Sequence, residues 1–339
     1  MGRSKHLSKS IQVAIRGTGH FLPGHPVASE ALDTRAGLKR GHLEQETGVK
    51  SRHFAEGISQ IDMAVTASQR ALDQAGLGAD DIDLVISANG VPFQTLPSTA
   101  PLVMRELGIG DGNAAAFDVN STCTSFISAL EIASRQVASD TCRHALIVSS
   151  EIASRGLPWS EQPEVAALFG DGAAAAIIGP DDRSGCGIRA SLMRSYPSKY
   201  EACQIAAGGT RFDYHENPDE FARHTLFRMN GADLFKLTLK HFPGFLDELL
   251  EQAGWQKEDV DLVVPHQASP HALTHMVRQT GFGGDKIVNL VAQVGNQIAA
   301  SVPTALDHAR RQGQAGPGKR LLMLGTSAGV SFSGLAMQM

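Results

Sequence analysis

The segment Ala71-Leu-Asp-Gln-Ala-Gly-Leu-Gly-Ala-Asp-Asp-Ile-Asp-Leu-Val85 recurs 178 residues later as Leu249-Leu-Glu-Gln-Ala-Gly-Trp-Gln-Lys-Glu-Asp-Val-Asp-Leu-Val263. In each copy a helical apolar pattern ends at Gln-Ala-Gly, and Asp-x-Asp-Leu-Val then begins a buried strand. A glycine in this position commonly ends a helix, so Gly76 and Gly254 mark the two helix ends. Two matching units predict a duplicated fold whose halves pack on each other. Independent use of the same α/β sequence pattern is the alternative explanation.

Strand-like and helix-like stretches alternate along the chain, which is typical of an α/β fold. The strands that we expect are residues 12–16, 84–88, 145–149 and 173–178, and the helices are residues 62–75, 125–138 and 234–253. The duplication places the two halves at residues 11–180 and 187–339. The irregular segment 196–230 is either a lid or pocket wall, or a surface excursion with no role.

Composition restricts the class of protein. The chain has 339 residues, 42% apolar content and a formal charge of −5, enough for a large core and without the charge excess of a nucleic-acid-binding surface. No secretory signal and no run of membrane-spanning length is visible, so we expect a cytoplasmic protein that neither binds nucleic acid nor spans a membrane. The four cysteines show no zinc-type spacing, which fits a reducing compartment.

Three residues could act together in catalysis. Cys123 precedes the helical pattern 125–138, where unpaired backbone N–H groups and the helix dipole are expected to lower the thiol pKa. His266 follows an apolar strand, at the sheet edge where α/β proteins bind ligands. Asn296 precedes a small-residue helix, nearly at the position equivalent to Cys123 in the second half. Each residue alone is more often structural. Together they predict an enzyme that holds one acyl group as a thioester and stabilises a second as an enolate.

Two other sequence patterns could form a catalytic or metal-binding site. Residues 325–329 match G-x-S-x-G, the nucleophile elbow of α/β-hydrolases, but that fold needs an Asp and a His later in the chain. The ten residues after Gly329 contain neither. His266, His271 and His275 could be metal ligands, but Pro270 interrupts them and no carboxylate lies nearby. We therefore expect no metal.

Five motifs resemble the β-ketoacyl-acyl carrier protein synthase III family of the thiolase superfamily. They are Asp118-Val-x-x-x-Cys123, Phe169-Gly-Asp-Gly-Ala173, Met229-Asn-Gly231, Val264-Pro-His-Gln-Ala268 and Gly295-Asn-x-x-Ala-Ala-Ser-Val-Pro-Thr-Ala-Leu306. The resemblance runs from Gly17 to the end of the chain. It implies a five-layered αβαβα fold, a homodimer, and a role in fatty acid biosynthesis or secondary metabolism.

The resemblance also implies a mechanism. Cys123 is the acylated nucleophile, and His266 and Asn296 drive a decarboxylative Claisen condensation with malonyl-acyl carrier protein. The backbone N–H groups of Cys123 and Ala328 form the oxyanion hole. The substrates are acyl-CoA or acyl-carrier protein and malonyl-carrier protein, with no cofactor. The alternatives are a Cys-His-Asn acyltransferase that forms esters or amides, a non-decarboxylative Claisen enzyme, and a non-enzymatic acyl-binding protein of the same fold.

Further positions are carried over as binding residues. By the resemblance, Arg155 matches an arginine that lies near the nucleotide of coenzyme A in the family. Lys236 and Arg278 match positions implicated in docking of the carrier protein. Phe93 and Leu96 lie in a loop that, in the family, reaches the acyl pocket of the other subunit of the dimer. The alternative to carrier docking is that the lysines are scattered, solvated surface charges without a partner.

The chain also departs from the family pattern. The family's adenine-stacking tryptophan and a nearby arginine are replaced by His42 and Glu46, and its glycine triplet is replaced by Ser327-Ala328-Gly329. These departures indicate a specialised synthase and weaken coenzyme A as the acyl donor.

Overall fold

The computed structural model describes residues 10–339 and contains two main β-sheets. The first has the order β1-β7-β6-β4-β5 and comprises β1 (Val13–Phe21), β4 (Leu84–Ser87), β5 (Ala115–Asp118), β6 (Ala145–Glu151) and β7 (Gly172–Pro180). The second has the order β11-β12-β13-β8 and comprises β8 (Gly187–Ser195), β11 (Leu262–Pro265), β12 (Arg320–Ser327) and β13 (Ser331–Gln338). Each sheet is formed by one half of the chain.

The two sheets share one pattern of strand directions. β4 runs parallel to β6, β6 antiparallel to β7, and β7 antiparallel to β1. In the second sheet β11, β12, β13 and β8 repeat these relations in the same order. A parallel bridge between Val263 and Ile287 stands where β5 stands in the first sheet. This correspondence supports our proposal that residues 11–180 and 187–339 are duplicated halves.

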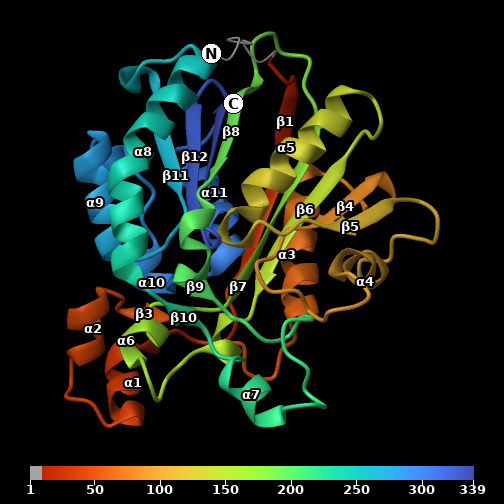
Figure 1. The fold of residues 1–339 in the computed structure, drawn as a ribbon. Coiled ribbons are helices and arrows are strands. Elements are labelled where there is room, and N and C mark those ends of the chain that lie inside the picture. The colour runs from red at the N-terminus through yellow and green to blue at the C-terminus, as the bar shows by residue number, and fades with distance from the viewer. Residues whose placement is uncertain (1–9) are drawn as a thin grey trace.

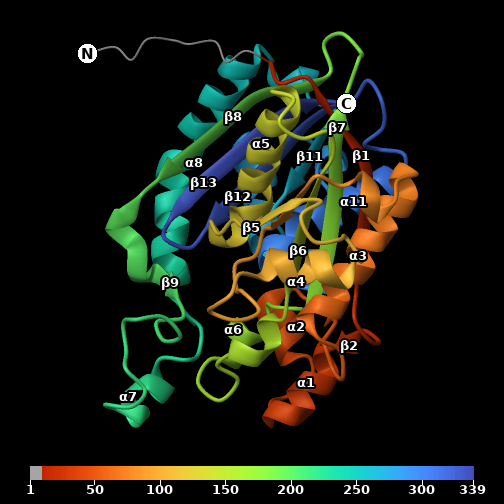
Figure 2. The same cartoon turned by 90° about the vertical axis from the view of Figure 1, so that its right-hand side faces the viewer.

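Helices form three layers around the two sheets. α5 (Ser125–Ala138) and α11 (Ser301–Arg311) lie between the sheets, and their side chains share one buried core with both. The outer layers are α3 (Gln60–Ala75) with α4 (Thr99–Glu106) on the first sheet, and α8 (Gly231–Ala253) with α9 (Pro270–Thr280) on the second. Figures 1 and 2 show the resulting αβαβα layers. The predicted α/β, thiolase-like architecture is confirmed.

Shorter elements gather at one end of the layers (Figure 1). They include β2 (Val27–Ala28), α1 (Ser29–Ala36), α2 (His42–Thr47), β3 (Ser51–Arg52), α6 (Pro163–Ala166), β9 (Cys203–Gln204), α7 (Pro218–Arg223), β10 (Arg228–Met229) and α10 (Val291–Val294). Short 3-10 helices are η1 (Ala79–Asp81), η2 (Thr122–Thr124), η3 (Ala153–Gly156), η4 (Pro197–Ala202), η5 (Lys257–Asp259), η6 (Gly284–Lys286) and η7 (Ile298–Ala300). Within residues 10–339, no helix combines the length and the apolar character needed to cross a membrane.

The repeated segment behaves as its sequence predicts. Gly76 and Gly254 adopt φ angles of 67° and 68° and end α3 and α8, as left-handed C-terminal glycines do. Each helix end is followed by a 3-10 turn, η1 or η5, and then by a buried strand, β4 or β11. The predicted helix 125–138 has the observed bounds, whereas β1 continues five residues past the predicted end at residue 16.

Gly17 determines how closely α3 packs against β1. A Cβ atom at this position would lie 2.2 Å from the Ala71 carbonyl oxygen and 2.8 Å from the Ala75 nitrogen. These are backbone atoms of α3, so they cannot rotate out of the way. The absence of a side chain therefore permits the contact between α3 and the edge strand of the first sheet.

We predict that Gly17→Ala lowers the free energy of unfolding by about 1–3 kcal/mol, because the added methyl overpacks this contact. Gly244→Ala is the control, since a Cβ there meets nothing within 4 Å and the residue lies inside α8. That variant should be neutral or more stable by roughly 0.5–1 kcal/mol. Urea denaturation of both variants provides the measurement, and an unchanged midpoint for Gly17→Ala would contradict the tight contact.

Candidate active site

Cys123 lies in η2, two residues before α5 begins. The preceding Thr122 has a φ of 51°, in the left-handed region that side chains other than glycine rarely adopt. The turn is closed by its own side chains: Asn120 Oδ1 accepts the Thr122 N–H at 2.9 Å, and Ser125 Oγ accepts the Ser121 N–H at 2.9 Å. The thiol is therefore held on a defined turn at the start of a buried helix.

The turn that carries Asn296 has the same construction. Ile298 has a φ of 49°, Asn296 Oδ1 accepts its N–H at 2.9 Å, and Ser301 Oγ accepts the Gln297 N–H at 3.1 Å. Asn296 therefore corresponds to Asn120, and Cys123 corresponds to a residue of η7 rather than to Asn296. The expectation that Cys123 and Asn296 lie at nearly equivalent places is made exact by these matched hydrogen bonds, which set the two residues three positions apart.

The Asn296 side chain faces the end of β11. Its oxygen is used within the turn, and its Nδ2 donates to the Ala268 carbonyl at 3.3 Å, two residues beyond His266. Its backbone bonds to Leu168 at 2.8 Å and to Gly170 at 3.1 Å. One amide hydrogen of the buried carboxamide is left for a further acceptor.

His266 is the first residue after β11. Its backbone N–H donates to the Leu324 carbonyl at 2.7 Å, and the residue is 5% exposed. The Nδ1 atom is buried and has no hydrogen-bond partner within residues 10–339. Burial lowers the pKa of His266 to about 4, so the imidazole is neutral at pH 7. A buried, neutral and unpaired imidazole is available to a bound ligand.

The neighbouring Gln267 fixes the backbone around His266. Its Nε2 donates to the carbonyls of Pro265 at 2.9 Å and Val288 at 3.1 Å, and its Oε1 accepts from Leu290 at 2.8 Å. The amide is nearly fully buried. These hydrogen bonds explain the glutamine of the Pro-His-Gln motif: Gln267 holds the backbone that carries His266.

Small residues bring the thiol and imidazole loops together. A Cβ at Gly325 of β12 would lie 2.7 Å from Thr124 Cγ2 and 3.6 Å from His266 Cβ. Just beyond β12, the Ala328 carbonyl accepts from Thr122 Oγ1 at 3.4 Å. The structure thus gathers Cys123, His266 and Asn296 where the turns before α5 and α11 meet the carboxyl ends of β11 and β12.

The backbone N–H groups of Ala328 and of Cys123 itself lie near the Cys123 sulfur and lower the pKa of the thiol. These donors stabilise a thiolate, but burial raises the pKa of the thiol well above its ordinary value. Nearby Cys203 and Glu151 add smaller contributions in the same direction. The expectation that the helix start lowers this pKa is therefore wrong for the resting enzyme, because desolvation outweighs the N–H donors.

The motif Phe169-Gly-Asp-Gly-Ala173 packs against the Asn296 turn. A Cβ at Gly170 would lie 2.3 Å from the Val294 carbonyl oxygen, and one at Gly172 would lie 2.2 Å from Gln297 Nε2. Asp171 accepts backbone N–H bonds from Ala55 at 2.8 Å and from Ser154 at 2.9 Å. The motif supports the Asn296 turn by close packing.

The sequence reasoning missed two residues close to the nucleophile. Glu151 ends β6 and is completely buried. Cys203 of β9 lies close enough to influence Cys123 electrostatically, so part of the irregular segment 196–230 forms a wall of the site. An acid that directly follows a buried apolar strand was a usable signal for Glu151. Nothing in the local sequence marks Cys203, because its position depends on how a long loop folds back.

Comparisons with known proteins identify the family. The family profile 3-oxoacyl-[acyl-carrier-protein (ACP)] synthase III matches residues 117–197, and its C-terminal profile matches residues 250–339. A β-ketoacyl-[acyl-carrier-protein] synthase III from Neisseria meningitidis is 33% identical over 330 residues, which are 96% of this chain and 98% of the relative. The chain belongs to the 3-oxoacyl-[acyl-carrier-protein] synthase III family. The resemblance seen in the sequence motifs is confirmed, and the chain is an acyltransferase.

Solved structures of synthase III proteins have the same fold. The 3-oxoacyl-(acyl carrier protein) synthase III of Pseudomonas aeruginosa has a TM-score of 0.86 and 28% identity, covering 96% of this chain and 98% of that one. The priming β-ketosynthase of the R1128 polyketide biosynthetic pathway has a TM-score of 0.87 and 28% identity, covering 99% and 98%.

The basic residues suggested by the synthase III resemblance lie on two neighbouring helices. Lys236 and Lys240 are exposed one turn apart on α8, and Arg278 is exposed on α9. Contacts join the helices here: the Phe235 and His275 rings lie 4.8 Å apart, and Gln279 Nε2 donates to the Leu239 carbonyl at 3.2 Å. We call Lys236, Lys240 and Arg278 the basic patch.

The other binding residues are exposed in separate places. Arg155 lies in η3, whereas Phe93 and Leu96 lie in the loop after β4 and are 41% and 84% exposed. The loop leaves large apolar side chains in solvent, together with Val91. None of these three positions is among the residues that surround Cys123, His266 and Asn296.

The structure does not support the two competing sites, the hydrolase-type serine at Ser327 and the histidine metal site. Ser327 Oγ donates to the adjacent Ala328 carbonyl, and among residues 10–339 no side-chain base is hydrogen-bonded to it. The three histidines have different surroundings: His271 contacts the Glu46 carbonyl at 3.2 Å, and His275 packs on Phe235. Across residues 10–339, no three His, Cys, Asp or Glu side chains are grouped to hold a metal ion.

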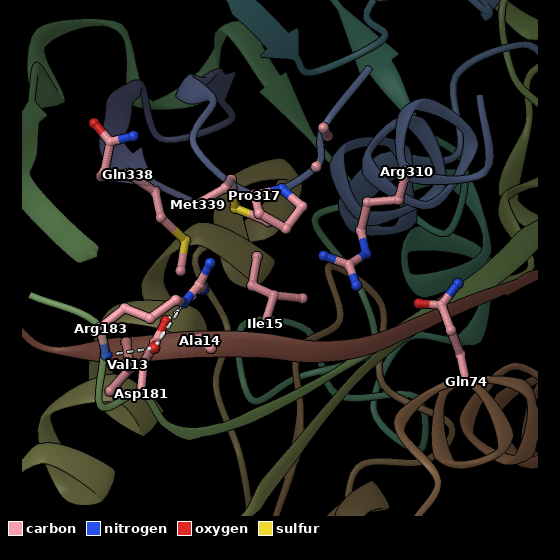
Figure 3. A pocket seen from close by; sticks show the side chains of 13 residues that line it. Val13, Ala14, Ile15, Gln74, Asp181, Arg183, Arg310, Pro317, Gln338 and Met339 are labelled. Carbon is pink, nitrogen blue, oxygen red and sulfur yellow. Dashed lines mark hydrogen bonds and ion pairs between the residues drawn. The ribbon is translucent and has the colours of Figure 1, made fainter. Parts of the chain in front are cut away.

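A pocket of about 280 Å³ lies at the other end of the sheets (Figure 3). It is lined by Arg310, Gln74 and the Asp181–Arg183 ion pair, beside the first residues of β1 and the last of β13. Cys123 and His266 lie at the carboxyl ends of the parallel strands, so this pocket is not the synthase site.

The raised thiol pKa predicts how Cys123 reacts. Its alkylation by iodoacetamide should rise about tenfold per pH unit up to at least pH 9, because only the thiolate reacts. In urea the same cysteine should level off near its unperturbed pKa of about 8.5. Peptide mass spectrometry follows both rates, and a plateau below pH 8 in the folded protein would contradict the assigned environment.

Proposed function

We propose that the enzyme performs a decarboxylative Claisen condensation between an acyl group on Cys123 and malonyl-acyl carrier protein, giving a 3-oxoacyl thioester. The supporting observation is the place of Cys123, whose sulfur lies near the backbone N–H groups of Cys123 and Ala328, on a turn that meets the loop of the neutral His266 imidazole and the Asn296 carboxamide. This arrangement supplies a nucleophile, an oxyanion hole and an enolate-stabilising pair.

In the first step, the Cys123 thiolate attacks the carbonyl carbon of an acyl thioester. The C–S bond of the donor breaks, and the donor thiol leaves with a proton. The N–H groups of Cys123 and Ala328 stabilise the ionised sulfur and then the tetrahedral oxyanion. Because burial raises the thiol pKa, ionisation is a large part of the barrier, and these donors lower it.

In the second step, malonyl thioester loses carbon dioxide and its electron pair moves to the thioester oxygen. Asn296 Nδ2 and the imidazole of His266 donate hydrogen bonds to that oxygen. A neutral imidazole suits this role, because a buried cation would hold the malonyl carboxylate in place. A carboxylate is costly in such an apolar site, whereas carbon dioxide is not.

In the third step, the enolate carbon attacks the acyl-Cys123 carbonyl. A carbon–carbon bond forms, the C–S bond breaks, and Cys123 is released as a thiolate. The thioester oxygen carries the negative charge between the two steps, so the chemistry uses no cofactor. The covalent intermediate gives ping-pong kinetics.

We predict that His266→Ala and Asn296→Ala keep acylation of Cys123 and lose condensation by about 10²–10³-fold, because each removes one enolate donor. Cys123→Ala should form no acyl-enzyme. Intact mass spectrometry measures acylation, and labelled carbon dioxide released from malonyl-carrier protein measures condensation. An acyl-enzyme that forms without any release of carbon dioxide would favour the ester- or amide-forming alternative.

The surroundings of His42 favour a carrier-bound acyl donor over coenzyme A. Where the resemblance places an adenine-stacking tryptophan, His42 Nε2 bonds to Glu164 Oε1 at 2.9 Å. The carboxylates of Glu164, Glu46 and Asp33 raise the pKa of His42. An acidic surface with its imidazole already paired disfavours the phosphates of coenzyme A.

The basic patch is proposed as the docking surface for acyl carrier protein. Opposite charges steer association, so an acidic carrier would be guided to Lys236, Lys240 and Arg278. The N-terminal part of α8 also exposes Phe235 (48%) and Leu239 (41%) between these charges. An apolar centre flanked by positive charge suits an acidic helix that carries a few apolar side chains.

We predict that Lys236→Glu with Arg278→Glu raises the KM for malonyl-carrier protein by about tenfold or more at low salt, with little change in kcat. The charge reversal repels the carrier but leaves the Cys123 cluster intact. Lys257→Glu, an exposed position in η5, is the control for altered net charge. Steady-state kinetics at two salt concentrations test the proposal, and equal KM values for both charge variants would exclude this surface.

A homodimer and a specialised role complete the proposal. The exposed apolar loop containing Phe93 and Leu96 is the expected contact with a second copy, since a soluble surface rarely leaves such groups uncovered. The structural likeness to a priming polyketide β-ketosynthase, together with the altered His42 region, supports a specialised synthase.

A further inference from the structure

Glu151 is a completely buried acid with no positively charged partner. Its Oε1 accepts the Gly90 N–H at 2.5 Å and its Oε2 accepts the Val91 N–H at 3.2 Å. Within residues 10–339 no lysine, arginine or histidine forms an ion pair with it. A buried acid without a cation is costly, so its backbone partners deserve an explanation.

The carboxyl group also lies close to the Asn296 turn. A Cβ at Gly90 would lie 3.3 Å from Glu151 Oε1 and 2.5 Å from Ile298 Cγ2, and the backbone N–H of Ala299, in η7, lowers the pKa of Glu151. The neighbouring Ile298 donates its N–H to Asn296 Oδ1. One side of the Glu151 carboxyl therefore fixes the turn whose amide faces the end of β11.

The other side of the carboxyl group connects to the Cys123 turn through Gly90. The Gly90 carbonyl accepts from Asn120 Nδ2 at 3.2 Å, and Asn120 Oδ1 accepts the Thr122 N–H at 2.9 Å. A Cβ at Gly90 would lie 2.5 Å from Ile298 Cγ2 and 3.5 Å from the Thr122 carbonyl carbon. Gly90 thus sits between the two turns, and Glu151 holds its N–H.

We propose that Glu151 is a positioning residue whose carboxyl group clamps the Cys123 turn and the Asn296 turn at a fixed separation. The inference rests on the proposed condensation, in which a carbon atom held by Asn296 must reach a carbonyl held by Cys123. Errors of about 1 Å in such an approach can cost about 10²-fold in rate.

The ionised carboxylate makes the stronger clamp, because its hydrogen-bond partners at Gly90 and Val91 are backbone N–H donors and a protonated acid would turn its own O–H toward one of them. Burial raises the pKa of Glu151 to about 8, against the three N–H groups, which lower it. The titratable groups that face it are the Asp171 carboxyl and, on η2, the Cys123 thiol. Ionised Glu151 in turn raises the pKa of Cys123. The clamp therefore makes the thiol harder to ionise, and this cost can be measured.

The test is Glu151→Gln, which keeps the shape and removes the charge. Condensation should fall by about 10–100-fold because one backbone contact is lost and the turns shift. Alkylation of Cys123 at pH 9 should become faster by about three- to tenfold, because a neighbouring negative charge is gone. The rise of wild-type condensation through pH 8 should be absent from the variant. A purely space-filling role for Glu151 predicts neither the loss of condensation in this isosteric variant nor the change in its pH dependence.

Asn120→Ala is the second variant, and it breaks the link on the Cys123 side while leaving Glu151 in place. Asn120 is exposed, so this variant tests the clamp even if Glu151→Gln does not fold. It should lose condensation without faster alkylation. Glu106→Gln, an exposed acid on α4, is the control and should match the wild type in both assays.

Two results would overturn the proposal. One is wild-type condensation in Asn120→Ala. The other is an alkylation rate of Cys123 in Glu151→Gln that is not faster than in the wild type, whatever its condensation rate. Failure of the proposed function gives a different result, because the wild type itself would then release no carbon dioxide from malonyl-carrier protein. The alkylation rates of Cys123 in the wild type and in Glu151→Gln would still test whether an ionised Glu151 lies beside the thiol.

Discussion

The close packing of α5 and α11 between the two sheets is the constraint on which the site depends. Both helices bury a broad face in the core that the two halves share, and their first turns meet at the seam between the halves. Glycines at positions 90, 170 and 325 remove the side chains that would separate these turns. The candidate site groups thus sit at the ends of packed helices and strands, which is the placement that precise chemistry requires.

Burial has opposite effects on the two ionisable groups of the site. It raises the pKa of the Cys123 thiol and lowers that of His266, so both groups are neutral at rest. In the proposed mechanism, neutrality suits the His266 imidazole as a hydrogen-bond donor but slows Cys123 as the nucleophile. The backbone N–H groups that reach the sulfur offset part of this cost, and a negative acyl oxygen can later use the same donors.

The sequence predicted more of the fold than of the electrostatics. Gly76, Gly254 and the Asp-x-Asp-Leu-Val segments gave the helix ends and the buried strands, because these depend on local backbone preferences. β8 and β13 were not predicted as strands: β13 is buried on both faces and rich in small residues, so it lacks an alternating pattern. The thiol pKa was misjudged because burial outweighs the effect of the helix start, and the neighbours of Cys123 include residues of β9 and β6, which no local pattern brings together. The correspondence between the halves followed from the sequence only approximately, to within three residues, because the exact match depends on side-chain hydrogen bonds. Ser125 and Ser301, not Cys123 and Asn296, are the matched residues that close the turns.

The paired left-handed residues Thr122 and Ile298 have a consequence for how such an enzyme could arise. Both halves keep an asparagine two positions earlier, but only the first places sulfur one position later. The ancestral turn can therefore be pictured as a neutral scaffold present twice, in which one copy acquired a nucleophile and the other kept an amide free for substrate. Specialisation of this kind makes each half useless alone. The two halves therefore depend on each other for the reaction as well as for their shared hydrophobic core.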